Sequence, residues 1–205
     1  DDPVVCDILN DITRPTITLH ASHTSVDAIH FEEHLQAVAT HQHAALAACS
    51  TCLARLEAAV QLIQRGELLE GLSLPDAVPF EEWLLLQREW LHQRRLATLT
   101  QITLAYEQQG ALREALRYAQ WQIKLEPWRE EAHRQAMRVL AQDGQRPQAL
   151  AQYELCRQIL ADELGIEPSA ETAALWQQIR ADAFQPVATP ATLTHHFPSQ
   201  LTPFV

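Results

Sequence analysis

The sequence is poor in glycine, in lysine and in long apolar runs. Its 205 residues include 5 glycines, and its 15 basic residues include a single lysine, Lys124, against 26 acidic residues. So few glycines argue against glycine-rich phosphate-binding loops and against an all-β fold with many tight turns. No apolar run reaches the roughly 18–20 residues of a membrane span. Because the net charge is −11, the chain should repel a phosphate backbone, and we expect it not to bind DNA or RNA by itself.

Cysteine is also scarce, and the four cysteines are Cys6, Cys49, Cys52 and Cys156. Four thiols are too few for a disulfide scaffold of this size, which favours a reducing, cytoplasmic setting. The opening residues Asp1 and Asp2 are acidic where a secretion signal would be basic. Hydrophobic residues make up 47% of the chain, which is typical of a folded protein. We therefore expect a folded protein of one or two domains that makes no membrane contact.

Apolar residues recur at intervals of three and four from residue 27 onward, which is the spacing of one helix face. Glycines and prolines separate the periodic segments. Ahead of them, the alternation of Thr16–His20 predicts a short strand. The fold class expected is all-α, preceded by a short N-terminal extended segment. The predicted helices include residues 29–38 and 53–63, followed by about 80–109, 112–125, 128–143, 146–163 and 169–183.

A repeat is visible in the second half of the chain. Gly144 follows Gly110 by 34 residues, and Ala149 follows Ala115 by the same interval. This spacing resembles a tetratricopeptide repeat, in which small residues let paired helices approach closely. Two related helix pairs are too few for a long solenoid, so the flanking helices must cap them. We expect TPR-like stacked helical hairpins arranged as a right-handed superhelix.

Several motifs together resemble one family. They are Gly66–Leu72, Phe80–Leu84, Gln87–Glu89, Leu125–Arg134, Gly144–Glu154 and Asp162–Thr172. Over about residues 26–180 the chain resembles the bacterial transcriptional activator domain of SARP-type regulators (Streptomyces antibiotic regulatory proteins) and their large multidomain relatives. The resemblance implies a TPR-like fold and a role in transcription regulation. In this family a winged-helix DNA-binding domain usually precedes the domain, and an NTPase domain follows it in the larger relatives.

That resemblance suggests three parts. Residues 1–25 would be an extended segment or a linker from an upstream DNA-binding domain. Residues 26–183 would be the TPR-like activator domain, and residues 184–205 a linker rich in proline and threonine that leads to a downstream domain. The chain contains no GxxxxGK[ST] motif, so nucleotide binding is not assigned to it.

The sharpest chemical motif is His41-x-His43-x5-Cys49-x-x-Cys52. Two imidazoles and two thiols within twelve residues are a candidate for a tetrahedral, structural Zn²⁺ site. Residues 44–48 are good helix formers, however, and one unbroken helix would hold His41 about 12 Å from Cys49, too far to share an ion. The alternatives are buried structural cysteines with solvent-facing histidines, or a redox pair formed by Cys49 and Cys52.

A partner-binding surface is the second candidate site. Trp90 and Trp121 could line a concave groove of the kind that binds peptides, although helical spacing makes most of the tryptophans core residues. The basic residues best placed for anionic contacts are Arg88, Arg94, Arg95 and Arg129, and a solvated helix face is the alternative interpretation for them.

No catalytic constellation is evident. No serine lies in a GxSxG elbow, and adjacent carboxylates such as Glu32 and Glu33 point to different sides of a helix. We therefore expect a regulatory protein rather than an enzyme. Its partners would be its own DNA-binding domain, a second copy or the transcription machinery, with DNA reached only through the upstream domain. A generic peptide-binding TPR scaffold and a metal- or redox-responsive sensor are the rival functions.

Overall fold

The computed structural model describes residues 9–13, 16–19, 25–42, 45–64, 66–74 and 76–184. At the N-terminal end, β1 (Leu9–Thr13) and β2 (Thr16–Leu19) form an antiparallel hairpin in which Ile12 pairs with Ile17. The strand predicted at residues 16–20 is thus confirmed as β2. Its partner β1 was not predicted.

Helices make up most of the described chain, as the all-α prediction requires. The bounds of the later helices lie within a few residues of those predicted from the periodicity. None of the helices in the described ranges is long and apolar enough to cross a membrane. In chain order the helices are α2 (Asp27–Thr40), the 3₁₀ turn η1 (Leu46–Ala48), α3 (Ser50–Leu62), α4 (Val78–Gln109), α5 (Leu112–Leu125), α6 (Glu130–Gln142), α7 (Arg146–Leu164) and α8 (Ala170–Arg180).

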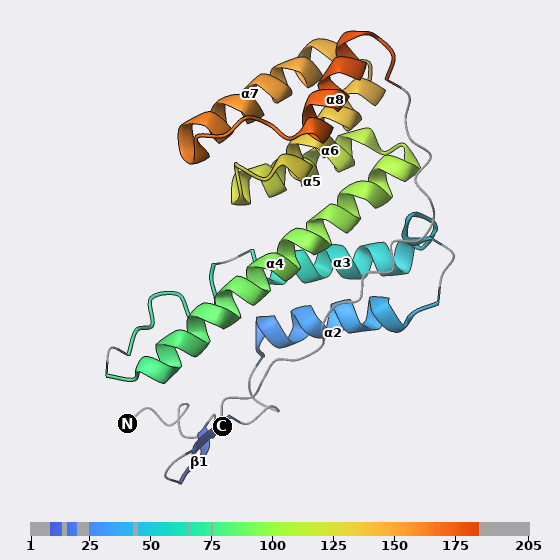
Figure 1. The fold of residues 1–205 in the computed structure, drawn as a ribbon. Helices are drawn as coiled ribbons and strands as arrows, with labels where there is room; N and C mark the ends of the chain where they lie inside the picture. Colours follow the sequence, from blue (N-terminus) through green and yellow to red (C-terminus); the bar gives the residue numbers. More distant parts are fainter. Residues whose placement is uncertain are drawn as a thin grey trace.

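The helices stack in the order of the sequence. α2 packs on α3, and each helix from α4 to α8 packs on the next. The long helix α4 contacts both α3 and α5, and it crosses the molecule from the α2–α3 pair toward the α5–α8 stack (Figure 1). α4 is therefore the element that joins the two halves of the protein.

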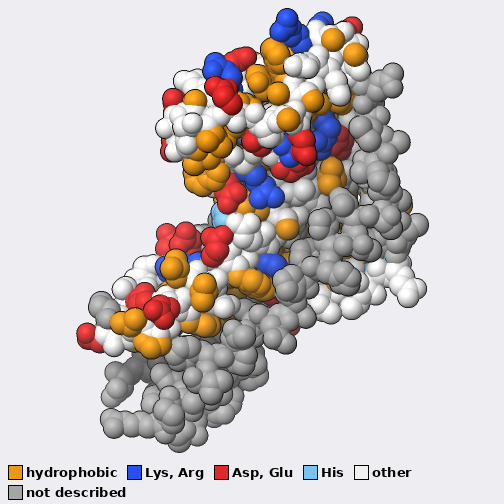
Figure 2. Space-filling view, in the orientation of Figure 1, with side chains coloured by type: hydrophobic (Ala, Val, Ile, Leu, Met, Phe, Trp, Pro, Cys, Tyr) orange, Lys and Arg blue, Asp and Glu red, His pale blue; other side chains and the backbone are white. Residues whose placement is uncertain are grey.

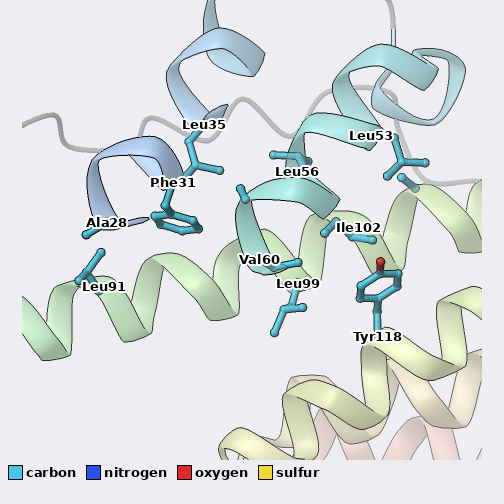
Figure 3. Close-up of a cluster of buried hydrophobic side chains, with 12 residues drawn as sticks. Ala28, Phe31, Leu35, Leu53, Leu56, Val60, Leu91, Leu99, Ile102 and Tyr118 are labelled. Carbon is cyan, nitrogen blue, oxygen red and sulfur yellow. The ribbon is translucent and has the colours of Figure 1, made fainter. Parts of the chain in front are cut away.

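Each half has its own apolar core. The first core lies between α2, α3 and α4, with Tyr118 entering it from α5 (Figure 3). The second core lies between α6, α7 and α8, around Met137 and Ile179. Large side chains that are fully buried in the first core include Phe31, Leu35, Leu56, Leu99 and Ile102.

The predicted repeat has a structural basis. Gly110 closes α4 and Gly144 follows α6, and both have φ of 72°. This left-handed conformation suits glycine, which carries no Cβ to clash with the following carbonyl. Ala115 and Ala149, which follow them at the same interval, are both completely buried. Small residues at these positions let consecutive helices approach closely, as the repeat predicts.

Candidate functional site

Arg94 on α4 makes a short ion pair with Glu32 on α2. Its Nη2 lies 2.6 Å from Oε2 of Glu32 and its Nε 3.2 Å from Oε1, which is a two-point contact. The Arg94 side chain is 9% exposed and that of Glu32 is 23% exposed. Burial raises the pKa of Glu32, and the guanidinium of Arg94 opposes that rise. The guanidinium also lies 5.1 Å from the ring centroid of Trp90, so this part of the predicted partner surface faces α2.

Arg95, the next residue, faces the other half of the protein. Its guanidinium lies 5.5 Å from the ring centroid of Trp121 on α5, a distance typical of a cation–π contact. Nearby, His92 Nε2 on α4 lies 2.9 Å from Glu126 Oε1. Arg129 Nη1 lies 3.7 Å from Glu126 Oε2. These side chains connect α4 to the junction between α5 and α6.

Arg88 fixes the loop that precedes α4. Its Nε and Nη2 each donate a hydrogen bond of 2.8 Å, to the carbonyls of Leu68 and Leu69 respectively. Leu69 has a positive φ of 50°, so this arginine supports a turn of uncommon backbone conformation. The structure therefore brings Trp90 to Arg94 and Trp121 to Arg95. It places Arg88 and Arg129 in separate contacts, each with its own intramolecular partner.

The surface between the two halves is hollowed. Figure 2 shows the hollow between the α5–α8 stack and the projecting N-terminal part of α4, with acidic and basic side chains on its walls. The N-terminal part of α4 also carries exposed apolar side chains, chiefly Leu85 at 68% and Leu86 at 67% exposure. Apolar side chains this exposed on a helix are candidates for contact with another domain or protein.

The predicted metal-ligand motif is partly assembled in the structure. Nδ1 of His41 lies 3.0 Å from Sγ of Cys52 and 3.6 Å from Sγ of Cys49. All three ligand atoms lie within 4.8 Å of one another. His43 lies outside the described residues. A His/Cys/Cys cluster that could hold an ion therefore exists at the α2–α3 connection.

The single unbroken helix considered for this segment is wrong. α2 ends at Thr40, His41 is extended with ψ of 122°, and η1 is one short turn before the extended residue Cys49. Tertiary contacts override the helix propensity of the alanines, because η1 packs against the first core and the Ala47 carbonyl accepts a 2.7 Å hydrogen bond from Gln109 Nε2 on α4. The break brings Cys49 and Cys52 back toward His41.

The two thiols of the cluster differ in environment. The backbone N–H of Cys52 is the main cause of a lowered pKa at Cys49, in line with the thiolate-stabilising field of a helix N-terminus. Burial raises the pKa of Cys52 to about 11, and the neighbouring Cys49 sulfur contributes to the rise. Cys156 on α7 is a separate buried thiol whose pKa is also about 11 because of burial.

Sequence reasoning missed two polar links between helices, one partly buried and one fully buried. Oε1 of Glu57 on α3 accepts hydrogen bonds from the hydroxyls of Tyr106 on α4 and Tyr118 on α5, at 2.7 and 2.8 Å. Gln122 donates to Thr103 and to Gln135, at 3.0 and 2.8 Å. The only sequence signal was a polar residue on an otherwise apolar helix face. Periodicity shows which face a residue lies on, but it does not identify the residue that it bonds.

Comparison with known proteins gives a family and a fold. The model of the bacterial transcriptional activator domain matches residues 26–180, which span α2 to α8. A solved structure of Mycobacterium tuberculosis EmbR in complex with a low-affinity phosphopeptide is similar in fold, with a TM-score of 0.62 and 21% sequence identity. The match covers 87% of this chain and 44% of the EmbR chain, so the chain spans less than half the length of that protein.

Proteins of curated function give no significant match to the sequence. The family match covers all the described helices, from α2 to α8, and it agrees with the resemblance seen in the sequence motifs. The TPR-like stack of helical hairpins is likewise the fold of the EmbR structure. This is a domain of transcription regulators of the SARP type, and the chain belongs to the bacterial transcriptional activator domain family.

Proposed function

We propose that this chain is the regulatory, protein-binding domain of a bacterial SARP-like transcriptional activator, and that it works in the cytoplasm. It would couple a separate winged-helix DNA-binding domain to a signal, to self-association or to the transcription machinery. The observation that carries the proposal is the family match over residues 26–180, which coincides with the helical stack from α2 to α8. In this scheme residues 1–25 join the DNA-binding domain to the stack, and residues 184–205 lead to a downstream domain.

The charges of the chain support a role in binding protein rather than DNA. The net charge of −11 disfavours a phosphate backbone. The arginines predicted for anionic contacts have partners within the chain, such as Glu32 for Arg94 and Glu126 for Arg129. Arg88, Arg94 and Arg129 are held by internal carbonyls or carboxylates and Arg95 lies over the Trp121 ring, which leaves DNA contact to the separate domain.

The partner surface we favour is the hollow beside α4, together with its N-terminal part. Trp90 and Trp121 are half-buried against the first core and contact Arg94 and Arg95, which would make their exposed parts rigid apolar anchors. The exposed Leu85 and Leu86 extend the apolar surface along α4. A shift in contacts at this surface would change the position of the DNA-binding domain and thus the output of the promoter.

Deletion tests the coupling directly. The full-length regulator and a version that lacks residues 26–180 are compared for promoter affinity and for transcription of a reporter. We expect the deletion to retain DNA binding through the separate domain and to lose activation. Leu85→Ser combined with Leu86→Ser is the milder variant, with exposed Leu155→Ser on α7 as its control. Unchanged activation by the deletion would refute the coupling role.

Two other functions are distinguishable from this one. A generic peptide-binding TPR scaffold would have no winged-helix sequence upstream in its gene. A metal- or redox-responsive sensor is favoured by the convergence of His41, Cys49 and Cys52. In a sensor, Cys49→Ser and Cys52→Ser would change the response of the promoter to metal or oxidant, beyond any loss of stability.

A further inference from the structure

We propose that His41, Cys49 and Cys52 bind a zinc ion that clips the end of α2 to the start of α3. This inference concerns occupancy of the cluster by metal and does not depend on the regulatory role proposed above. It begins with the geometry of the three ligand atoms, which come from both sides of the connection between the two helices.

The spacing of the ligand atoms fits a tetrahedral ion. With Zn–S near 2.3 Å and Zn–N near 2.0–2.1 Å, tetrahedral ligands lie about 3.6 Å apart for sulfur and nitrogen and about 3.8 Å apart for two sulfurs. The distance from Cys49 Sγ to His41 Nδ1 is 3.6 Å. Cys52 Sγ is closer to the same nitrogen, at 3.0 Å, so a small side-chain rotation admits the ion.

The ligand chemistry selects the metal. Two thiolates and an imidazole are soft and borderline ligands that suit Zn²⁺, whereas Mg²⁺ and Ca²⁺ require oxygen ligands. The cluster of His41, Cys49 and Cys52 contains no carboxylate. A structural zinc site takes four ligands, so His41, Cys49 and Cys52 leave one position for a ligand outside the cluster.

The three ligand residues differ in their exposure to solvent. Cys52 is 1% exposed, Cys49 is half-buried, and His41 is exposed. An ion could therefore enter from the solvent side, where His41 lies, and be shielded from water on the Cys52 side. This is the arrangement of a closed structural site with an entry path.

The first turn of α3 has no side-chain cap. Cys49, the N-cap of α3, makes no side-chain capping hydrogen bond, and η1 is three residues long. An ion at this point would cross-link α2 to α3. It would also stabilise the first turn of α3, which lacks a side-chain cap. α3 also carries Glu57, which binds the hydroxyls of Tyr106 and Tyr118. The clip would therefore stabilise the whole first core.

Metal content of the full chain is the test. The chain is purified without a histidine tag and without chelator, and its zinc is measured by elemental analysis. We expect about one zinc ion per chain. After removal of zinc, titration with Co²⁺ should give the intense visible bands of a tetrahedral site and a thiolate charge-transfer band. A chain that holds no zinc and gives no such bands with Co²⁺ would overturn the proposal.

Variants separate ligation from folding. Cys49→Ser and Cys52→Ser should abolish the charge-transfer band, and Cys156→Ser, at a buried thiol far from the cluster in sequence, should retain it. Because His41 is exposed, His41→Asn should keep the fold and still weaken Co²⁺ binding.

Thermal unfolding gives a second readout. Removal of zinc should lower the Tm of the parent chain and of Cys156→Ser by several degrees, because an ion that binds only the folded state stabilises it. The Tm of Cys52→Ser should not respond to chelator. A Cys49–Cys52 disulfide, found by thiol counting in a chain purified with reductant and free of zinc, would replace the zinc site with a redox pair.

Discussion

Tyr118 on α5 donates its hydroxyl to Glu57 on α3 across 2.8 Å, within the first core. The same carboxylate oxygen accepts the hydroxyl of Tyr106 on α4 at 2.7 Å, and the two tyrosine rings stack with centroids 5.8 Å apart. One carboxylate thus ties together three helices. Burial is the main cause that raises the pKa of both tyrosines, that of Tyr106 to about 12, so both remain donors.

Glu57→Ala should therefore be strongly destabilising. It leaves two tyrosine hydroxyls without their acceptor, one of them on the almost fully buried Tyr118. We expect a loss of about 2–4 kcal/mol in the free energy of unfolding, and about 1–2 kcal/mol for Tyr118→Phe. Urea unfolding followed by circular dichroism measures both losses. Glu163→Ala, at an exposed position on α7, is the control and should change stability little.

Arg94→Ala should destabilise the packing of α2 on α4. The substitution leaves the carboxylate of Glu32 half-buried without its guanidinium, and it removes the contact with Trp90. We expect a loss of about 2–4 kcal/mol. The exposed pair of Arg157 and Glu154 is the control, because Arg157→Ala should cost about 0–1 kcal/mol. Equal losses at the two sites in denaturant titrations would contradict this account of Arg94.

The two glycines of the repeat should respond alike to substitution. An added Cβ would meet no atom within 4 Å at Gly110 or at Gly144, so any cost comes from the positive φ alone. Gly110→Ala and Gly144→Ala should each cost about 1–2 kcal/mol. The asparagine variants should cost less, since asparagine tolerates this conformation better. Thermal unfolding of the four variants checks the ranking, and alanine variants as stable as the parent would argue against it.

His133 on α6 should make stability depend on pH. It is fully buried, its Nε2 donates to the Pro127 carbonyl at 2.7 Å, and its Nδ1 accepts from Gln152 at the same distance. Burial lowers the pKa of His133 below 6.5, although the two hydrogen bonds and the charge of Glu130 oppose the shift. The folded state therefore favours the neutral form of the His133 imidazole.

The sign of the effect follows from proton binding. Between the lowered pKa and 6.5, the unfolded chain binds more protons at this residue than the folded chain does. The contribution of neutral His133 is complete above pH 6.5 and is lost as the pH falls through that window. We expect His133→Gln to flatten this part of a stability profile measured between pH 5 and 7. A variant with the same acid slope as the parent would assign that slope to other groups.

The sequence predicted the regular parts of this fold well and the long-range polar contacts poorly. α5 spans Leu112–Leu125, as its periodicity indicates, and Gly110 ends α4 where expected. These features depend on local spacing and on backbone conformation. The pairing of Arg94 with Glu32 joins residues far apart in the chain, and no pattern along the sequence shows that the arginine is buried rather than on a solvated face.

The candidate metal site lies between these two cases. The spacing from His41 to Cys52 suggested the ligands, but the alanines between them favour a helix that would have kept them apart. The break depends on the packing of Leu46 and Ala47 against the first core and on the hydrogen bond from Gln109. Those contacts exist only once α4 is in place, so local propensity alone could not decide between the alternatives.

We propose that this domain acts through protein contacts and leaves DNA binding to a separate domain. Fluorescence anisotropy of a labelled mixed-sequence DNA duplex, titrated with the isolated chain at physiological salt, tests it most directly. A chain with a net charge of −11 should leave the anisotropy unchanged over the whole titration. Saturable binding that weakens as salt is raised would contradict the claim, because it would place a nucleic-acid surface on the helical stack itself.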